Sequence, residues 1–440
     1  MLPAAGILAD GLGAGASTAQ APEPIRYSSS VSSDARRILV AQALRAFGYG
    51  FVSVLLGIVL EARGWSTVQV GVLLTAIVGG TGIMSVLVGT FGDRIGRRST
   101  YSFLFLGLVV SGVAFGLSSE LWLLVAVALT GSLSTEVVES GPFTSLEQAM
   151  LPQTVEPRLR NRIFGRYNAV ATVAGSVGAL AAGGPQLLRD AGVGVPADRA
   201  FFLLLVPVGL AGAAVARSLS VRVEEGGEGR RKVPLRRSRR TVARLSGLFA
   251  LDSFGGGFVV QSFIAFWFRR RFGVSPEILG LVFFAIGFLQ SISFVVATRL
   301  TDRIGLLPTM VFTHLPSNIL LAAIPLAPTF PLAIGLLLGR FALSQMDVPA
   351  RQAYIVALVD PEERTAAAAY TNAARSLIRP AGPALAGVVQ QISLGLPFVL
   401  AGGIKAAYDV ALWVWFRRVP LPGDDEQLEE AASERGEAPA

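Results

Sequence analysis

The sequence contains no cysteine, a single histidine (His314) and only two lysines among its 440 residues. Without cysteine it can form neither a disulfide nor a thiolate metal site, and a lone histidine excludes zinc motifs that need two. Charged residues make up only 15% of the chain, whereas hydrophobic residues make up 52%, and the mean hydropathy is +0.58. This balance is too apolar for an ordinary soluble protein, so the composition predicts a membrane protein.

The formal net charge of +8 comes almost entirely from arginine. The arginines cluster in short gaps between apolar runs, which is typical of membrane topology rather than of a nucleic-acid groove. We therefore expect the lipid bilayer, and no nucleic acid, as a partner. The first 30 residues lack a basic start and a strong apolar block, so we expect a disordered cytoplasmic tail over residues 1–35 rather than a signal peptide.

Long apolar runs recur along the rest of the chain, each close to the roughly 20 residues that a helix needs to span a bilayer. Period-2 alternation is missing, so the spans are predicted to be helices rather than barrel strands. We predict an all-α membrane protein with twelve transmembrane helices, near residues 37–61, 67–90, 99–118, 121–149, 157–184, 198–217, 243–267, 276–299, 308–327, 330–350, 362–391 and 396–417.

The distribution of arginine predicts the orientation of the chain in the membrane, because the gaps between spans on the cytoplasmic side are enriched in basic residues. The gaps after helices two, four, six, eight and ten carry most of the arginines, and residues 217–244 alone hold ten Lys/Arg. The run of three arginines at 269–271 is an exception on the opposite side. We expect a multi-pass protein of the plasma (cytoplasmic) membrane, with both termini, a basic linker at 218–241 and an acidic tail at 419–440 in the cytoplasm.

An internal repeat divides the chain into two halves, 36–217 and 242–418. The segment Asp93–Gly96 recurs as Asp302–Gly305, and Glu147-Gln148-Ala149 recurs as Arg351-Gln352-Ala353. The repeat predicts two pseudo-symmetric six-helix bundles. Parallel halves of this kind place a site between them, near the middle of the bilayer.

The stretch GTFGDRIGRRST, residues 89–100, resembles the loop motif between helices two and three of the major facilitator superfamily, with Phe91 where leucine is usual. The resemblance covers about residues 36 to 418 and implies that family's twelve-helix fold. It also implies a cytoplasmic latch, in which Asp93 meets the start of helix eleven and Arg97 pairs with an acid on helix four, here Glu147. The alternative is that the arginines only enforce topology. The candidate latch residues are Gly89, Gly92, Asp93, Arg94, Gly96, Arg97, Arg98, Glu147, Asp302, Arg303 and Arg351.

Ionisable side chains inside the membrane are costly and usually face a partner or a wet cavity. The family places helices one, four, seven and ten around the cavity, and each carries one such residue here: Arg45, Glu136, Asp252 and Arg340. The repeat pairs Arg45 with Asp252 and Glu136 with Arg340, so positions are kept and signs are inverted. One hypothesis makes Asp252 and Glu136 the proton carriers; the other makes the four residues two static salt bridges.

Further polar residues join the candidate substrate and proton pathway. The second-choice acid is Glu139. Arg375 and Arg379 could bind an anionic substrate or pair with Asp347, which could itself serve a latch with Arg351. Gln261 and Gln290 could face the cavity or only bridge helices. Lys405 and Asp409, four residues apart on peripheral helix twelve, favour a local salt bridge, and His314 favours an ordinary polar role.

These features favour a secondary transporter that works by alternating access, with no cofactor and no metal. The first hypothesis is proton-coupled export of a small organic substrate, with protons as the coupling ion; helix five carries only a degraded form, GSVGALAAGGP, of the family's antiporter pattern. The alternative is a carrier of organic or phosphorylated anions that uses the intramembrane arginines. No nucleophile, metal or nucleotide motif supports an enzyme. We expect a monomer.

Overall fold

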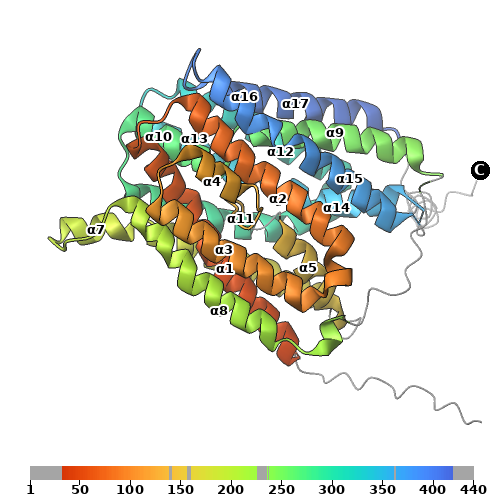
Figure 1. The fold of residues 1–440 in the computed structure, drawn as a ribbon. Helices are drawn as coiled ribbons and strands as arrows, with labels where there is room; N and C mark the ends of the chain where they lie inside the picture. The colour runs from red at the N-terminus through yellow and green to blue at the C-terminus, as the bar shows by residue number, and fades with distance from the viewer. Residues whose placement is uncertain are drawn as a thin grey trace, which may run out of the picture.

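The computed structural model describes residues 32–137, 141–155, 160–224, 235, 237–360 and 363–419. Helices occupy all twelve predicted positions (Figure 1). In the N-terminal half the first three spans are α1 (Ser33–Ala62), α2 (Thr67–Ile95) and α3 (Arg97–Leu117). The fourth span consists of α4 (Leu121–Ala128) and α5 (Pro142–Met150), the fifth is α6 (Arg160–Ala181) followed by α7 (Gly184–Asp190), and the sixth is α8 (Leu205–Ser218). The predicted terminal tails lie mostly outside the described residues, as do residues 225–234 and 236 of the predicted linker.

The C-terminal half repeats this order of elements. The seventh span consists of α9 (Arg239–Gly257) and α10 (Gln261–Phe272), the eighth is α11 (Pro276–Ile304) and the ninth is α12 (Leu306–Ala323). The tenth span consists of α13 (Phe330–Ser344) and α14 (Asp347–Leu358), the eleventh of α15 (Arg364–Ile378) and α16 (Ala381–Val389), and the twelfth is α17 (Leu396–Phe416). Short 3₁₀ turns at Asp198–Leu204 and Ile324–Leu326 extend the sixth and ninth spans.

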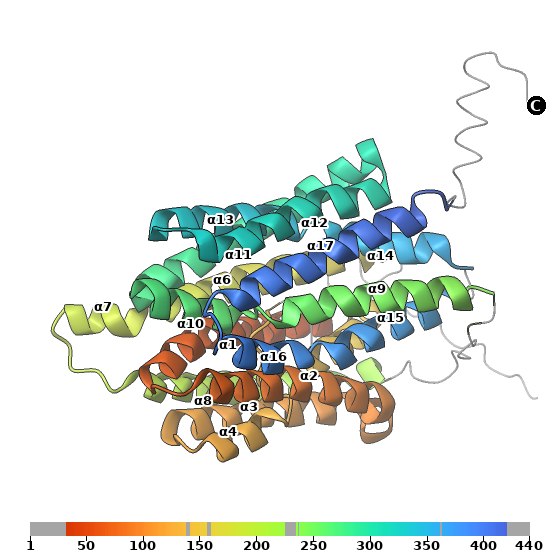
Figure 2. The ribbon, with the colours of Figure 1, turned by 90° about the horizontal axis from the view of Figure 1, so that it is seen from above.

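The two halves form two side-by-side bundles that pack in the same way (Figure 2). In the first half α1 packs on α6 and α3 on α8; in the second half α9 packs on α15 and α12 on α17. Between the halves, α2 meets α16 and α6 meets α11, again as repeat-equivalent contacts, while α1 meets α10. The fold is therefore the predicted one, with two pseudo-symmetric bundles of six spans.

Within the part of the chain that the structure describes, eight spans are long and apolar enough to cross a membrane. The helix is divided in spans four and ten, which the repeat relates to each other, and also in spans seven and eleven. The single helices expected at 121–149, 243–267, 330–350 and 362–391 are each two helices in the structure. Interrupted helices at equivalent positions of two halves are typical of the binding region in transporters.

The break in the fourth span begins directly after α4. Gly131 has a φ of 69°, and a Cβ there would lie 2.3 Å from the carbonyl oxygen of Gly80 on α2. Only glycine tolerates both the left-handed backbone and this close approach. The chain can therefore leave the helix here, and it carries Glu136 on a non-helical segment.

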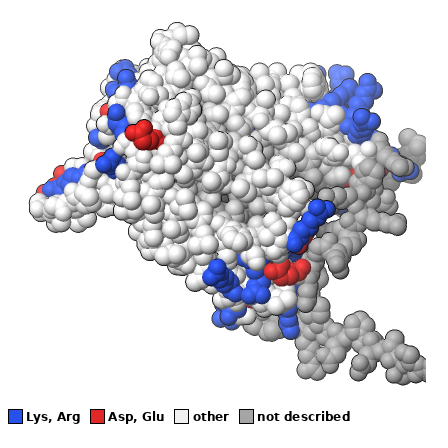
Figure 3. Space-filling view, viewed as in Figure 1, with Lys and Arg blue, Asp and Glu red and all other residues white. Residues whose placement is uncertain are grey.

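Charged side chains are confined to the two ends of the molecule on the face in Figure 3, and a broad uncharged surface separates them. An uncharged belt between two charged ends is the pattern of a protein that spans a bilayer. The first and last described helices, α1 and α17, begin and end at the same side of the molecule (Figure 1), which we call the termini end.

The two halves are in close contact at the end opposite the termini. A Cβ on Gly71 of α2 would lie 2.8 Å from Cα of Gly387, and one on Gly57 of α1 would lie 2.6 Å from Cβ of Ala265. Toward the termini end, a Cβ on Gly89 of α2 or Gly165 of α6 would have no atom within 4 Å. The conformation is thus closed at the far end and open toward the termini end.

Candidate functional site: a charged cavity between the two halves

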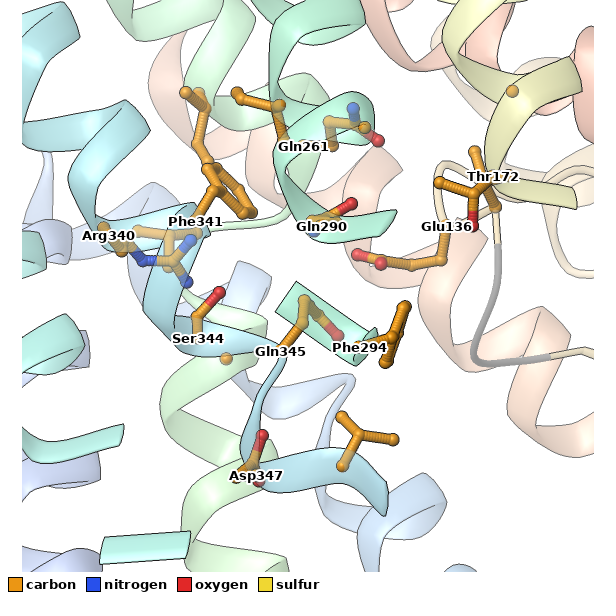
Figure 4. Close-up of a pocket in the computed structure, with 18 of the residues that line it drawn as sticks. Glu136, Thr172, Gln261, Gln290, Phe294, Arg340, Phe341, Ser344, Gln345 and Asp347 are labelled. Carbon is orange, nitrogen blue, oxygen red and sulfur yellow. The ribbon is translucent and has the colours of Figure 1, made fainter. Parts of the chain in front are cut away.

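A cavity of about 170 Å³ lies between the halves, at the level of the interrupted helices. The N-terminal half lines it with the break after α4 and with α6. The C-terminal half lines it from every one of its spans, with α13 and α14 contributing the largest share (Figure 4). All eight described residues that the sequence predicted for the pathway on spans four, seven, eight, ten and eleven line this cavity: Glu136, Asp252, Gln261, Gln290, Arg340, Asp347, Arg375 and Arg379.

Positive charge exceeds negative charge in the lining. The cations are Arg340, Arg351, Arg375, Arg379 and Lys405, and the acids are Glu136, Asp252 and Asp347. Lys405 and His314 were not expected here, because they lie on spans twelve and nine, which the family resemblance makes peripheral. Of the remaining pathway candidates, Glu139 lies outside the described residues.

Arg45 does not line the cavity, contrary to expectation. Its guanidinium is buried inside the N-terminal half, where Nη2 contacts the Glu147 carboxylate at 2.7 Å and Nε donates to it at 3.3 Å. The hydroxyls of Tyr101 and Tyr167 donate to the same carboxylate, each at 2.6 Å. Glu147 is therefore bound to Arg45 and not to Arg97, because helix one turns this arginine toward α5 and away from the cavity.

The equivalent positions of the C-terminal half also contact each other. Nη1 of Arg351 lies 3.5 Å from Asp252, and the repeat relates this pair to Arg45 and Glu147 with both signs exchanged. The predicted inversion of sign is present, but each half forms its own pair. The pair between spans one and four is fully enclosed, whereas the pair between spans seven and ten borders the cavity.

Asp252 has two further partners that the sequence analysis assigned elsewhere. The Lys405 ammonium forms a short contact with its carboxylate, and Nε2 of His314 lies 3.7 Å from it. Lys405 thus pairs across the bundle with Asp252 rather than along its own helix with Asp409. Asp409 instead contacts Nδ1 of His314 at 2.8 Å.

Arg340 projects into the cavity from α13 (Figure 4). Its guanidinium carbon lies 4.4 Å from the ring centre of Phe341, a cation–π geometry. Two of its nitrogens, Nε and Nη1, are buried and make no hydrogen bond to the described residues. A buried guanidinium with free donors is costly unless an anion completes its contacts.

Glu136 and Arg379 form a contact between the halves. Nη2 of Arg379 on the eleventh span lies 2.8 Å from the Glu136 carboxylate in the broken fourth span. Both side chains are partly exposed, at 19% and 28%. A polar pair that joins the halves at the cavity has to rearrange when the halves move relative to each other.

The predicted latch residues lie at the termini end. Helix α2 continues through the motif to Ile95, and Gly96 makes the turn with a φ of 97°. The Asp93 carboxylate accepts from Nε of Arg97 at 2.6 Å and is 59% exposed. Asp302 and Arg303 are exposed at the equivalent turn. Asp93 therefore faces the open end in this conformation, and the expected contact with the start of helix eleven remains a prediction.

Arg97 and the following residue have a partner that the sequence analysis missed. The backbone N–H groups of Arg97 and Arg98 donate to the carboxylate of Glu224, at 2.7 and 3.2 Å, so this residue after the sixth span caps α3. Glu363 does the same in the other half, accepting from the backbone N–H groups of Arg237 and Ser238 at 3.0 and 2.9 Å. Such acid caps stabilise helix N-termini.

Comparison with known proteins identifies the family. The sequence profile of the Major Facilitator Superfamily matches residues 38–268 and 245–439. The chain belongs to the major facilitator superfamily. Over 433 residues it is 24% identical to the "Uncharacterized membrane protein YJR124C" of Saccharomyces cerevisiae, covering 90% of this chain and 97% of that protein.

Solved structures of major facilitator transporters share the fold. The inward-open xylose transporter XylE from E. coli matches with a TM-score of 0.67 and 13% identity, over 90% of this chain and 99% of that one. The human organic anion transporter MFSD10 matches with a TM-score of 0.61 and 17% identity, over 86% and 98%. A bacterial homologue of the human lysosomal transporter Spinster, in an inward-facing and occupied conformation, matches with a TM-score of 0.63 and 18% identity, over 86% of this chain and 94% of that one. At these identities the likeness shows the fold alone.

Membership in the major facilitator superfamily establishes the general activity. The protein is a multi-pass membrane transporter that works by alternating access, and it is not an enzyme. In such transporters the cavity between the halves opens to one side of the membrane at a time.

Proposed function

We propose that this chain is a secondary transporter of small organic anions, carboxylated or phosphorylated, and that Arg340 holds the anionic group. The observation that carries the proposal is the pair of buried Arg340 nitrogens that make no hydrogen bond to the described residues, in a cavity whose lining has more cations than acids. A planar guanidinium matches the two oxygens of a carboxylate or phosphate. This observation is our reason for proposing the anion carrier rather than the exporter.

The other residues that line the cavity also match the chemistry of an organic anion. Arg375 and Arg379 supply further positive charge from the eleventh span, and Gln261 and Gln290 offer amide groups to a polar substrate. Phe294 and Phe341 provide aromatic surface beside them. An organic anion would place its charged group on the arginines and its apolar part against the two phenylalanines.

A second candidate is proton-coupled export of small organic compounds. It is favoured by the two carboxylates, Glu136 and Asp252, that line the same cavity. In either case we propose that both termini lie in the cytoplasm of a plasma-membrane protein and that the monomer is the transporting unit. The arginine-rich termini end supports this orientation.

The test is uptake into liposomes that contain the purified protein. The probes are labelled succinate and glucose 6-phosphate, with the lipophilic cation tetraphenylphosphonium for comparison. We expect uptake of an anion, and we expect Arg340→Gln to raise its KM about 10- to 100-fold, because a hydrogen bond between charged groups contributes about 1.5–3 kcal/mol. Arg340→Lys keeps the positive charge but loses the planar guanidinium that can bind two oxygens at once, so its rise in KM should be intermediate.

The comparison between probes separates the two candidates. Transport of the cation alone, driven by an acid-inside gradient and abolished by Asp252→Asn, would contradict the anion proposal and support the exporter. An anion KM that Arg340→Gln leaves unchanged would show that the anionic group is held elsewhere.

A further inference from the structure

The charged groups behind Asp252 form a chain that leads from the cavity to the peripheral spans. His314 of α12 lies between two carboxylates, with Nδ1 at 2.8 Å from Asp409 and Nε2 at 3.7 Å from Asp252. Asn318, one turn further along α12, donates to Asp409 at 2.8 Å. His314, Asn318 and Asp409 are all almost completely buried.

An imidazole between two carboxylates responds to a single proton. A neutral ring carries one N–H, whereas the protonated ring carries two, so that Nδ1–H donates to Asp409 and Nε2–H forms an ion pair with Asp252 that is longer than a hydrogen bond. In the neutral ring with its hydrogen on Nδ1, that atom donates to one oxygen of Asp409, and the Asn318 amide donates to the other. The site can therefore take up a proton at Nε2, beside Asp252, without losing these hydrogen bonds.

Charged and polar groups from four neighbouring helices surround His314. Asp252 comes from α9, Arg340 from α13, Asp347 and Arg351 from α14, and Lys405, Tyr408 and Asp409 from α17. The Tyr408 ring stands edge-on to the imidazole at 5.8 Å between centres. His314 and Asp252 both line the substrate cavity, and Asp252 contacts both His314 and Arg351.

We propose that the His314–Asp409 pair, on spans nine and twelve, is the site that binds the coupling proton, and that the proton and the anion bind together. The proposal rests on the proposed anion transport. An anion beside Asp252 adds negative charge to the cavity, and a proton at His314 offsets it, so each ligand favours binding of the other. The net movement is one proton with each substrate, in the same direction, and no bond is made or broken other than that to the proton.

The first arm of the test observes the proton directly. His314 is the only histidine in the chain, so protein labelled with ¹⁵N-histidine, with any purification tag removed, gives imidazole signals from this residue alone. In lipid nanodiscs we expect these signals to change between pH 5 and 9 with a single transition, and Asp409→Asn to displace that transition. Signals that stay constant over this range in the wild type would overturn the proposal, whatever the substrate.

The second arm separates coupling from transport. His314→Gln should abolish the stimulation of anion uptake by an inward proton gradient, at least about tenfold in initial rate, while exchange of labelled for unlabelled anion persists. Ile319→Leu, on the lipid-exposed face of the same helix, is the matched control and should keep both activities. The probes are succinate and glucose 6-phosphate.

The outcomes distinguish the two proposals. If the wild type carries neither anion, the proposed function fails, and the nanodisc titration still decides whether His314 binds a proton. If the wild type carries an anion and His314→Gln retains full proton-driven uptake, the coupling site is wrong and the anion proposal stands.

Discussion

At the scale of single residues, the two halves use the same positions for opposite purposes. Arg45 and Glu147 form an enclosed pair whose carboxylate is further saturated by two tyrosine hydroxyls. The equivalent Asp252 and Arg351 border the cavity and have additional partners. The first pair therefore has a structural role, and the second belongs to the moving, ligand-facing part of the protein.

This difference predicts a large stability effect in the first half. Arg45→Gln or Glu147→Gln leaves a charge buried without its partner, so each should cost about 3–5 kcal/mol of stability. The double variant should be no less stable than either single one, because it removes both charges. Unfolding of the purified protein in a detergent–denaturant series measures all three. Additive losses would show that the two side chains do not act as a pair.

At the scale of helices, close glycine contacts hold the far end closed. Gly71→Val places a side chain against the backbone of Gly387, where even a Cβ would lie 2.8 Å from Cα. We expect α2 and α16 to separate and the protein to favour the state open at the far end. Gly403→Val on α17, where a Cβ would meet no atom within 4 Å, is the matched control.

The chain lacks cysteine, so a single introduced thiol reports this change. A cysteine at Gln290, which lines the cavity, should react faster with a membrane-impermeant reagent applied from the far end when Gly71→Val is present. An unchanged rate in Gly71→Val, or an equal increase in the control, would contradict the assigned role of this contact.

Much of the helical arrangement could be predicted from the sequence, and the breaks could not. Apolar length alone locates a span, and the repeat relates the halves, but neither reveals where a helix stops inside the membrane. Gly131 and the Gly141-Pro142 step flank the break of span four, and Arg379-Pro380 marks that of span eleven. These glycine and proline residues are the sequence signals of the breaks, but the apolar composition around them predicts continuous helices.

The site was predicted in part for a similar reason. Charges at membrane depth are rare, so Glu136, Asp252, Arg340 and Arg379 could be selected from their type and position. The rotation of a helix about its axis is set by packing, which explains why Arg45 faces away from the cavity. The family resemblance makes the spans of His314, Lys405 and Asp409 peripheral and so predicts only local roles for them, whereas buried polar residues on such spans need partners on other helices.

At the scale of the whole molecule, the structure is one end state of a two-state cycle. Closing the termini end requires the exposed turns at Asp93 and Asp302 to approach the opposite half, and opening the far end requires the loss of its inter-half contacts. These include the pair of Arg269 with Glu61 at 3.0 Å and the bond from the Ser262 hydroxyl to the Ser53 carbonyl at 2.8 Å. An anion that binds the two states unequally shifts their populations.

The most direct test of the account measures that shift. Spin labels on cysteines at Ile95 and Ile304, exposed and repeat-equivalent residues at the termini end, report the distance between the two halves. The account predicts that succinate or glucose 6-phosphate adds a population with a shorter distance, that Arg340→Gln suppresses it, and that tetraphenylphosphonium does not produce it. A distance that no anion changes, or one that the cation changes equally in wild type and Arg340→Gln, would contradict an anion site in the cavity between the halves.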